Sequence, residues 1–224
     1  MSWSRKVRNV KPILVLAGAA ATIAIVVALM APTLSRAQEA GAPAKTLKPV
    51  SAFDSIADEK ARSIAIFEET GKVLLDPRCV NCHPKGDSPL QNNLAKHEPP
   101  VSRGEANFGM AGMQCTTCHG PANVDVVGQA ATIKSIPGNP NWHVAPIEMA
   151  WEGKTLAEIC VQIKDQNRNG GKTLAELVEH MAKDDLVGWG WNPGKGREPV
   201  AGTQAEFGAL YEAWAATGAH CPAS

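Results

Sequence analysis

Residues 79–83 read CVNCH, and residues 115–119 read CTTCH. Each pentad holds two cysteines separated by two residues, with a histidine directly after the second. At this spacing a short helical turn presents both sulfurs to one porphyrin edge, where they add to the vinyl groups, and brings the next imidazole to the iron. The pentads therefore predict two covalently bound haems c. The first is held by Cys79 and Cys82 with His83 as proximal ligand, and the second by Cys115 and Cys118 with His119.

Two other interpretations of the four cysteines are open. Paired C-x-x-C motifs also build four-cysteine zinc sites, and cysteines of exported chains form disulfides. A histidine follows both cysteine pairs, and a zinc site would give neither histidine a role. Haem attachment is therefore the favoured interpretation.

The distance between the pentads predicts how the two haems are arranged. Only residues 84–114 separate His83 from the second cysteine pair, and this segment contains four Pro and four Gly without a sustained apolar period. Such a segment is typical of a loop and leaves no room for a complete first domain. The two haems should therefore share one domain and lie close together.

The sixth ligand of each iron decides between two functions. Two strong-field ligands leave no position for a substrate and favour electron transfer, whereas an open position permits catalysis. The favoured distal ligands are His97 and His143, which lie on proline-flanked loops. The weaker alternatives are Met110, Met113 and His180, the last on the flank of a helix about 110° from its apolar stripe.

The rest of the chain predicts a mainly α domain with long loops and no substantial sheet, spanning residues 53–224. Apolar spacing predicts a helix over 54–70. Three further helices begin with the capping-box pattern Thr-x-x-Glu, at Thr155, Thr173 and Thr203. The loop 187–199 holds Trp189 and Trp191, which would pack on a haem, form a docking patch or close the core.

The N-terminus predicts export. Residues 1–37 hold five of the 22 basic residues and no acidic one, and an apolar run at 13–31 leads to a small-residue cleavage pattern. This segment is a signal peptide or a membrane anchor, followed by a flexible tether at 38–52. The domain would then be periplasmic, touching the membrane only through an uncleaved segment. Its 17 Lys and Arg against 22 Asp and Glu favour no nucleic-acid partner.

Cys160 and Cys221 lie outside the pentads. Cys160 falls on the apolar face of a predicted helix, where an inert buried thiol is one possibility. In an exported chain with one other unpaired cysteine, a disulfide is favoured. It would tie the C-terminal tail to the helix at 155–165.

Several stretches together resemble a family of short exported dihaem c-type proteins often labelled isoquinoline 1-oxidoreductase subunits. They are NCHPKGDSPLQ, CTTCH, PNWHVAPIEMAWEGKTLAEIC, RNGGKTLAELVEHM, LVGWGW and GAHCP, within roughly residues 70–222. The resemblance implies redox partner proteins, among them a molybdenum-dependent hydroxylase or dehydrogenase that supplies electrons. We therefore expect an electron-carrier subunit rather than an enzyme. The alternative is a small dihaem peroxidase or reductase with one open iron.

Overall fold

The structure is a computed structural model that describes residues 45–121, 139–194 and 196–223, all within one compact unit. The predicted signal segment 1–37 and residues 38–44 of the predicted tether lie outside the described residues. Within the described ranges, no helix combines the length and the apolar character needed to cross a membrane.

The described chain is mainly helical, as the sequence predicts. Its longer helices are α1 (Glu59–Leu74), α3 (Leu156–Lys164), α4 (Leu174–Lys183) and α6 (Gln204–Ala216). Single turns fill the intervals: η1 (Val50–Phe53), α2 (Pro77–Val80), η2 (Cys115–Thr117), η3 (Ile147–Met149), α5 (Asp185–Gly188) and η4 (Trp189–Trp191).

The three predicted capping boxes are all formed. Thr155, Thr173 and Thr203 each accept a hydrogen bond from the backbone N–H three residues on, and the glutamate there accepts one from the threonine N–H. These reciprocal bonds satisfy amide donors that a helix start leaves without partners. At the other end of α6, Gly218 has φ +88°, the left-handed conformation that commonly follows a helix C-terminus.

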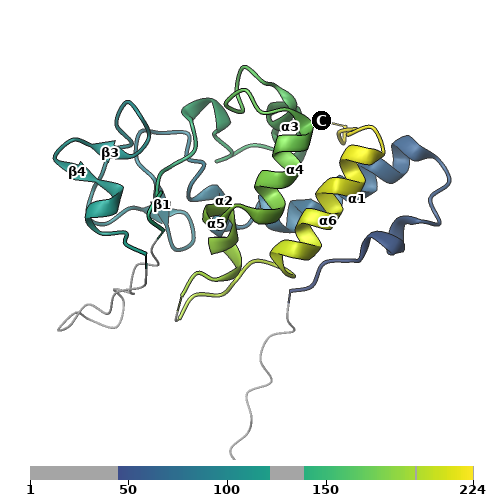
Figure 1. The fold of residues 1–224 in the computed structure, drawn as a ribbon, viewed down its shortest axis with the longest axis horizontal. Helices are drawn as coiled ribbons and strands as arrows, with labels where there is room; N and C mark the ends of the chain where they lie inside the picture. The colour runs from purple at the N-terminus through teal and green to yellow at the C-terminus, as the bar shows by residue number, and fades with distance from the viewer. Residues whose placement is uncertain (1–44, 122–138, 195, 224) are drawn as a thin grey trace, which may run out of the picture. The chain divides into compact units, whose positions relative to one another are not determined.

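The core lies where α6 packs against α1 and α4 (Figure 1). Its centre is an aromatic cluster in which Phe67 lies 4.7 Å from Trp214 and Phe207 lies 5.2 Å from Tyr211, ring centre to ring centre. All four side chains are essentially inaccessible to solvent. Aromatic groups of this size dominate the free energy gained by burial, so this cluster anchors the helical half.

Residues 84–114 form mostly irregular loop with two short antiparallel hairpins. In the first, β1 (Leu90–Gln91) pairs with β2 (Ala95–Lys96), with Leu90 opposite Lys96. In the second, β3 (Gly109–Met110) pairs with β4 (Met113–Gln114), with Met110 opposite Met113. Gly109 has φ +94°, and a Cβ there would lie 2.6 Å from the Met113 carbonyl oxygen, so this hairpin requires glycine.

The N-terminal boundaries differ from the expected ones. Helix α1 begins at Glu59 rather than near residue 54, because the Asp58 side chain accepts a hydrogen bond from Ala61 N at 2.7 Å and caps the helix there. Residues 45–52 of the predicted tether pack on the domain. Leu47 is buried, and Lys48 N donates to a Glu69 carboxylate oxygen at 2.8 Å.

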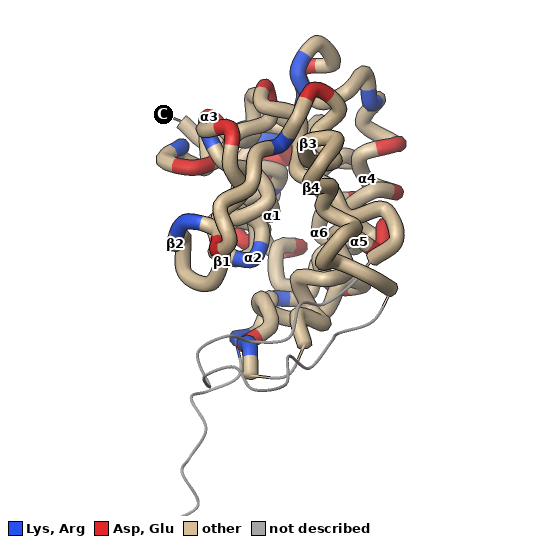
Figure 2. Tube along the Cα trace, turned by 90° about the vertical axis from the view of Figure 1, so that its left-hand side faces the viewer, with Lys and Arg blue, Asp and Glu red and all other residues tan. Residues whose placement is uncertain are grey.

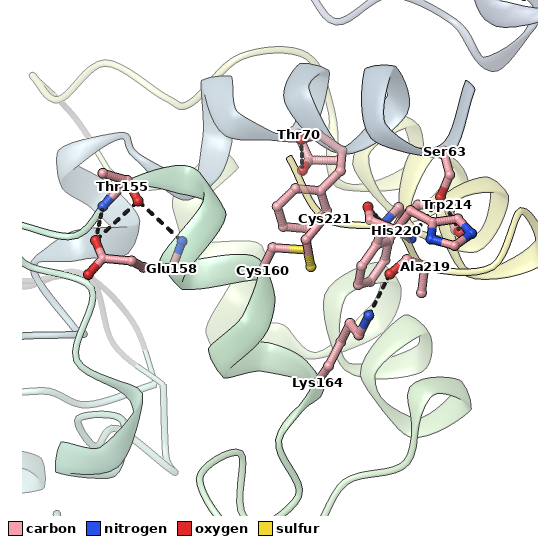
Figure 3. Close-up of a disulfide and its surroundings, with 11 residues drawn as sticks. Ser63, Thr70, Thr155, Glu158, Cys160, Lys164, Trp214, Ala219, His220 and Cys221 are labelled. Atoms are coloured by element: carbon pink, nitrogen blue, oxygen red, sulfur yellow. Dashed lines mark hydrogen bonds between the residues drawn. A yellow bond between two sulfur atoms is a disulfide. The ribbon is translucent and has the colours of Figure 1, made fainter. Parts of the chain in front are cut away.

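The predicted disulfide joins Cys160 of α3 to Cys221 of the C-terminal tail (Figure 3). Cys160 is fully buried. Next to the disulfide, Lys164 Nζ donates to the Ala219 carbonyl oxygen at 2.8 Å. The tail is thereby held against α3 by a covalent bond and a hydrogen bond.

Candidate functional site: two cysteine–histidine turns

The first pentad is a helical turn. The Asp76 side chain accepts from Arg78 N at 2.9 Å and caps α2, whose first residue is Pro77. The turn then continues beyond α2, with Cys82 N donating to Cys79 O at 3.1 Å and His83 N to Val80 O at 2.9 Å. The residues before the cysteines therefore explain the helical turn, because an aspartate cap and a proline at the first position start a helix there.

His83 is held on two sides. Its Nδ1 lies 2.7 Å from the Met149 carbonyl oxygen, an acceptor, so Nδ1 carries the proton. Its ring stacks on Trp151, with centres 3.6 Å apart and planes 6° from parallel. Burial lowers the pKa of His83 to about 4, against the opposing effect of the Met149 hydrogen bond. The imidazole is therefore neutral at pH 7, with an unprotonated Nε2 that can bind a metal.

A cavity of about 350 Å³ adjoins Cys79, Cys82 and His83, and we call it the first-pentad cavity. This volume falls in the range of roughly 300–1,000 Å³ that cofactor and ligand pockets show. Its wall is mainly apolar and includes Val73, Leu74, Phe108, Val144, Leu177, Met181, Leu186, Trp189 and Phe207. Two further histidines, His143 and His180, also line it.

The thiols are protonated and close to one another. Burial is the largest cause of a raised pKa at both Cys79 and Cys82. The pKa of Cys82 is raised to about 11. The nearby Cys115 is the second cause of the raised pKa of Cys82. None of the four pentad cysteines forms a disulfide within the described chain.

The second pentad is also a helical turn. Cys115 follows the β3–β4 hairpin and begins η2, with Cys115 N donating to Phe108 O at 2.8 Å. Cys118 N and His119 N then both donate to Cys115 O, at 3.2 and 2.9 Å. Both pentads are thus helical turns, although a side chain caps only the first of them.

Two aromatic rings of the described residues lie next to His119. The ring of Trp142 stacks on it, with centres 4.3 Å apart and planes 8° from parallel, as Trp151 does on His83. His97 lies on another side, with its ring centre 6.3 Å away. Its Nδ1 lies 2.8 Å from the Pro99 carbonyl oxygen, which leaves Nε2 for a metal.

The predicted candidates for the distal ligands lie at different places in the structure. His97 accompanies the second pentad, whereas His143 and His180 both line the first-pentad cavity. Met110 and Met113 are exposed on the β3–β4 hairpin and do not line that cavity.

His180, predicted to lie on a helix flank, is half-buried at the first-pentad cavity because α4 packs with α6 beside the first pentad. One sequence signal could have raised its rank. Asp184 lies four residues on, at the spacing that brings two helical side chains together, and its Oδ2 is 3.2 Å from His180 Nδ1.

Sequence reasoning also missed Arg103, a buried residue that ties the site together. Its guanidinium donates to four acceptors: Asn107 Oδ1 at 3.0 Å, Ala145 O at 2.6 Å, Pro84 O at 3.4 Å and Gly86 O at 2.9 Å. Pro84 and Gly86 follow the first pentad, Asn107 precedes the second, and Ala145 lies in the irregular segment after Trp142. One side chain therefore fixes the three segments that carry the histidines.

The chain segment that contains the second pentad carries no charge. Residues 106–121 contain no charged side chain, whereas basic and acidic residues are interspersed over the rest of the described chain (Figure 2). Phe108, Met110 and Met113 are each more than 40% exposed there. A flat apolar group attached at Cys115 and Cys118 would cover part of this surface.

The residues around the first-pentad cavity are of the kinds that a haem requires. A haem is a flat apolar disc with a metal at its centre and carboxylates on one edge. The first-pentad cavity offers thiols, apolar walls and a neutral imidazole. It also offers two buried indole donors, Trp151 Nε1 and Trp189 Nε1, which have no hydrogen-bond partner within the described residues. Donors of this kind suit the carboxylate edge of such a group.

Comparison of the chain with protein-family models, with curated proteins and with solved structures gave no match. Among the side chains of the described ranges, no group of three or more His, Cys, Asp or Glu is arranged to hold a bare metal ion.

Proposed function

We propose that the protein is an exported dihaem c-type cytochrome that transfers single electrons between redox partner proteins. The observation that carries the proposal is that further histidines accompany the histidine of each pentad. His119 has His97 as its partner, and His83 shares a cavity with His180 and His143. An iron with a histidine on each face has no position left for a substrate, which suits a carrier.

The distance between His97 and His119 supports this pairing. Two imidazoles that bind one metal from opposite sides, with each nitrogen about 2 Å from it, have their ring centres about 6 Å apart. The ring centres of His97 and His119 are 6.3 Å apart. This separation supports a shared metal between His97 and His119.

The chain's own residues hold the imidazoles in a metal-binding state. The carbonyl oxygens of Met149 and Pro99 accept Nδ1–H from His83 and His97, which directs the lone pair of each Nε2 outward. Trp151 and Trp142 stack on the proximal rings and restrict their rotation. When bound, haem iron would supply the one-electron couple, and these contacts would keep its ligands in place in both oxidation states.

The proposal extends to location and partners. The predicted signal segment supports a periplasmic location, where haem is attached to c-type cytochromes. The sequence resemblance adds an electron donor, a molybdenum-dependent hydroxylase or dehydrogenase, and a downstream acceptor protein. Segment 106–121, which carries no charged side chain and exposes Phe108, Met110 and Met113, is the part of the described chain best suited to bring a haem edge close to such a partner.

Expression in a host that matures c-type cytochromes tests the proposal. The intact mass of the purified chain should show two covalent haems. The double variants Cys79→Ala/Cys82→Ala and Cys115→Ala/Cys118→Ala should each retain one. Redox titration of the wild type should show two one-electron steps, without carbon monoxide binding to the reduced protein.

Two results would overturn parts of the proposal. A chain that matures without covalent haem, although a control cytochrome in the same cells acquires it, would exclude a cytochrome. A wild-type haem that is high-spin and binds carbon monoxide would favour the dihaem enzyme instead.

A further inference from the structure

The carboxylate of Asp184 is held in one orientation beside His180. Its Oδ1 accepts from Leu186 N at 2.8 Å and from Val187 N at 3.4 Å, and so caps α5. Its carbonyl oxygen accepts from Gly188 N at 2.8 Å and from Gln204 Nε2 at 2.9 Å. Its own N–H donates to His180 O at 3.2 Å.

Oδ2 of this fixed carboxylate lies 3.2 Å from His180 Nδ1. An ionised carboxylate can only accept, so the proton is on Nδ1, and Nε2 keeps its lone pair. Since His180 lines the same cavity as His83, its Nε2 is available on the side of the cavity formed by α4. His143 lines the cavity as well, and the Asn141 carbonyl oxygen likewise accepts its Nδ1 proton, but His143 lies on an irregular segment and has no carboxylate partner among the described residues.

The histidine that accompanies the second pentad has a different acceptor. His97 Nδ1 faces a neutral backbone carbonyl, Pro99 O, at 2.8 Å, whereas His180 Nδ1 faces a carboxylate. A charged acceptor draws the Nδ1 proton more strongly and makes the imidazole a stronger electron donor to a metal. The ferric state carries one more positive charge than the ferrous state, so a stronger donor stabilises the ferric state.

We propose that His180 is the sixth ligand of the haem attached at the first pentad, and that Asp184 is a positioning residue that lowers the reduction potential of this haem. The inference rests on the proposed function. It adds a difference between the two proposed haems: the distal histidine of one would donate its Nδ1 proton to a carboxylate, and that of the other to a backbone carbonyl oxygen. The couple itself transfers one electron between the iron and a redox partner protein and breaks no bond.

Asp184→Asn is the decisive variant, measured in the full-length protein with its haems attached. Asparagine is as good a helix N-cap as aspartate, so its side-chain oxygen can still accept from Leu186 N and Val187 N. The amide nitrogen in place of Oδ2 cannot accept the His180 proton. We expect one of the two midpoint potentials to rise, while both haems stay low-spin and the helix content stays unchanged.

Asp185→Asn is the matched control. Asp185 is the next residue and is exposed in the first turn of α5, so its substitution removes the same charge without touching His180. It should leave both potentials close to their wild-type values. A potential that stays unchanged in Asp184→Asn, or that shifts equally in both variants, would overturn the role of Asp184.

His180→Ala tests the ligand directly. One haem should become high-spin and bind carbon monoxide, whereas His143→Ala should leave both haems low-spin. If His143→Ala produces the high-spin haem and His180→Ala does not, the ligand assignment is wrong while the cytochrome proposal stands. A wild-type chain that acquires no covalent haem would instead remove the proposed function itself.

Discussion

The imidazole rings of His97 and His119 lie 6.3 Å apart, centre to centre, with their planes at 51°. The two residues are far apart in sequence and come from a loop and from a cysteine–histidine turn. The hydrogen bond of His97 Nδ1 to Pro99 O fixes the loop histidine locally, so its position does not depend on a long helix. This relationship makes His97 the histidine that completes the second haem in our proposal.

Replacement of His97 by alanine should therefore change one haem only. We expect His97→Ala to convert one low-spin haem to a high-spin form that binds carbon monoxide when reduced, while the other stays low-spin. Electron paramagnetic resonance and the optical spectrum measure both states. The control is His220→Ala, because His220 contacts Ser63 of α1 and Trp214 of α6 rather than a pentad (Figure 3). Two low-spin haems in His97→Ala would show that another residue is the ligand.

Replacement of Arg103 should strongly destabilise the part of the domain that contains the two pentads. Its replacement by alanine removes a buried charge and leaves four oxygen acceptors without their donor, two of them on Pro84 and Gly86. Hydrogen bonds from charged groups contribute about 1.5–3 kcal/mol each, and the contributions are not additive, so we expect a loss of about 3 kcal/mol or more. Guanidinium unfolding of the protein with its haems attached, followed by tryptophan fluorescence, measures this loss.

Arg103→Lys separates charge from geometry. Lysine keeps the positive charge but has no planar fork, so it cannot reach all four acceptors. We expect it to recover only part of the lost free energy of unfolding. Full recovery by lysine would mean that the charge of Arg103, rather than its hydrogen bonds, stabilises the domain.

Features encoded within a few residues could be predicted from the sequence. The helical turns at Cys79 and Cys115 and the three capping boxes each depend on a local pattern. The Cys160–Cys221 disulfide could be predicted because few cysteines remained outside the pentads.

Features that depend on packing could not be predicted. His180 lies on a helix flank by periodicity alone, and it reaches the first-pentad cavity only because α4 packs with α6. Trp151 stacks on His83 although the two residues are 68 positions apart, and no local sequence pattern predicts such a contact. The two hairpins were not predicted, because strands of two residues are too short to show an alternating apolar pattern.

The capping box at α4 should make the protein sensitive to acid. Hydrogen bonds from Thr173, through its backbone first and its side chain second, lower the pKa of Glu176 below its usual 4.5. A carboxylate whose pKa is lower in the folded state stabilises the fold above its unfolded pKa, and this contribution is lost as the pH falls through the folded pKa. Glu176→Gln should therefore flatten the dependence of the melting temperature on pH below about 4.5.

Two variants check the capping box at α4. Thr173→Ala should cost about 1 kcal/mol at pH 7, the usual effect of removing a threonine cap. Glu179→Gln is the control on the same helix, because Glu179 forms a surface ion pair with Lys183, 2.9 Å away, and such pairs contribute little. A Glu179→Gln profile as flat as that of Glu176→Gln would show that general helix charge, not the box, causes the acid sensitivity.

The Cys160–Cys221 disulfide should stabilise the helical half and leave the haem sites intact. It closes a loop of 61 residues that contains α4, α5 and α6, and restricting a loop of this length in the unfolded chain is worth about 4 kcal/mol. We expect Cys160→Ser/Cys221→Ser to lower the unfolding free energy by about that amount, as measured by guanidinium unfolding. Two covalent haems should remain, since both pentads lie outside this loop. The single variant Cys160→Ser should be destabilised as much as the double variant, and haem loss in the double variant would show that maturation requires the disulfide.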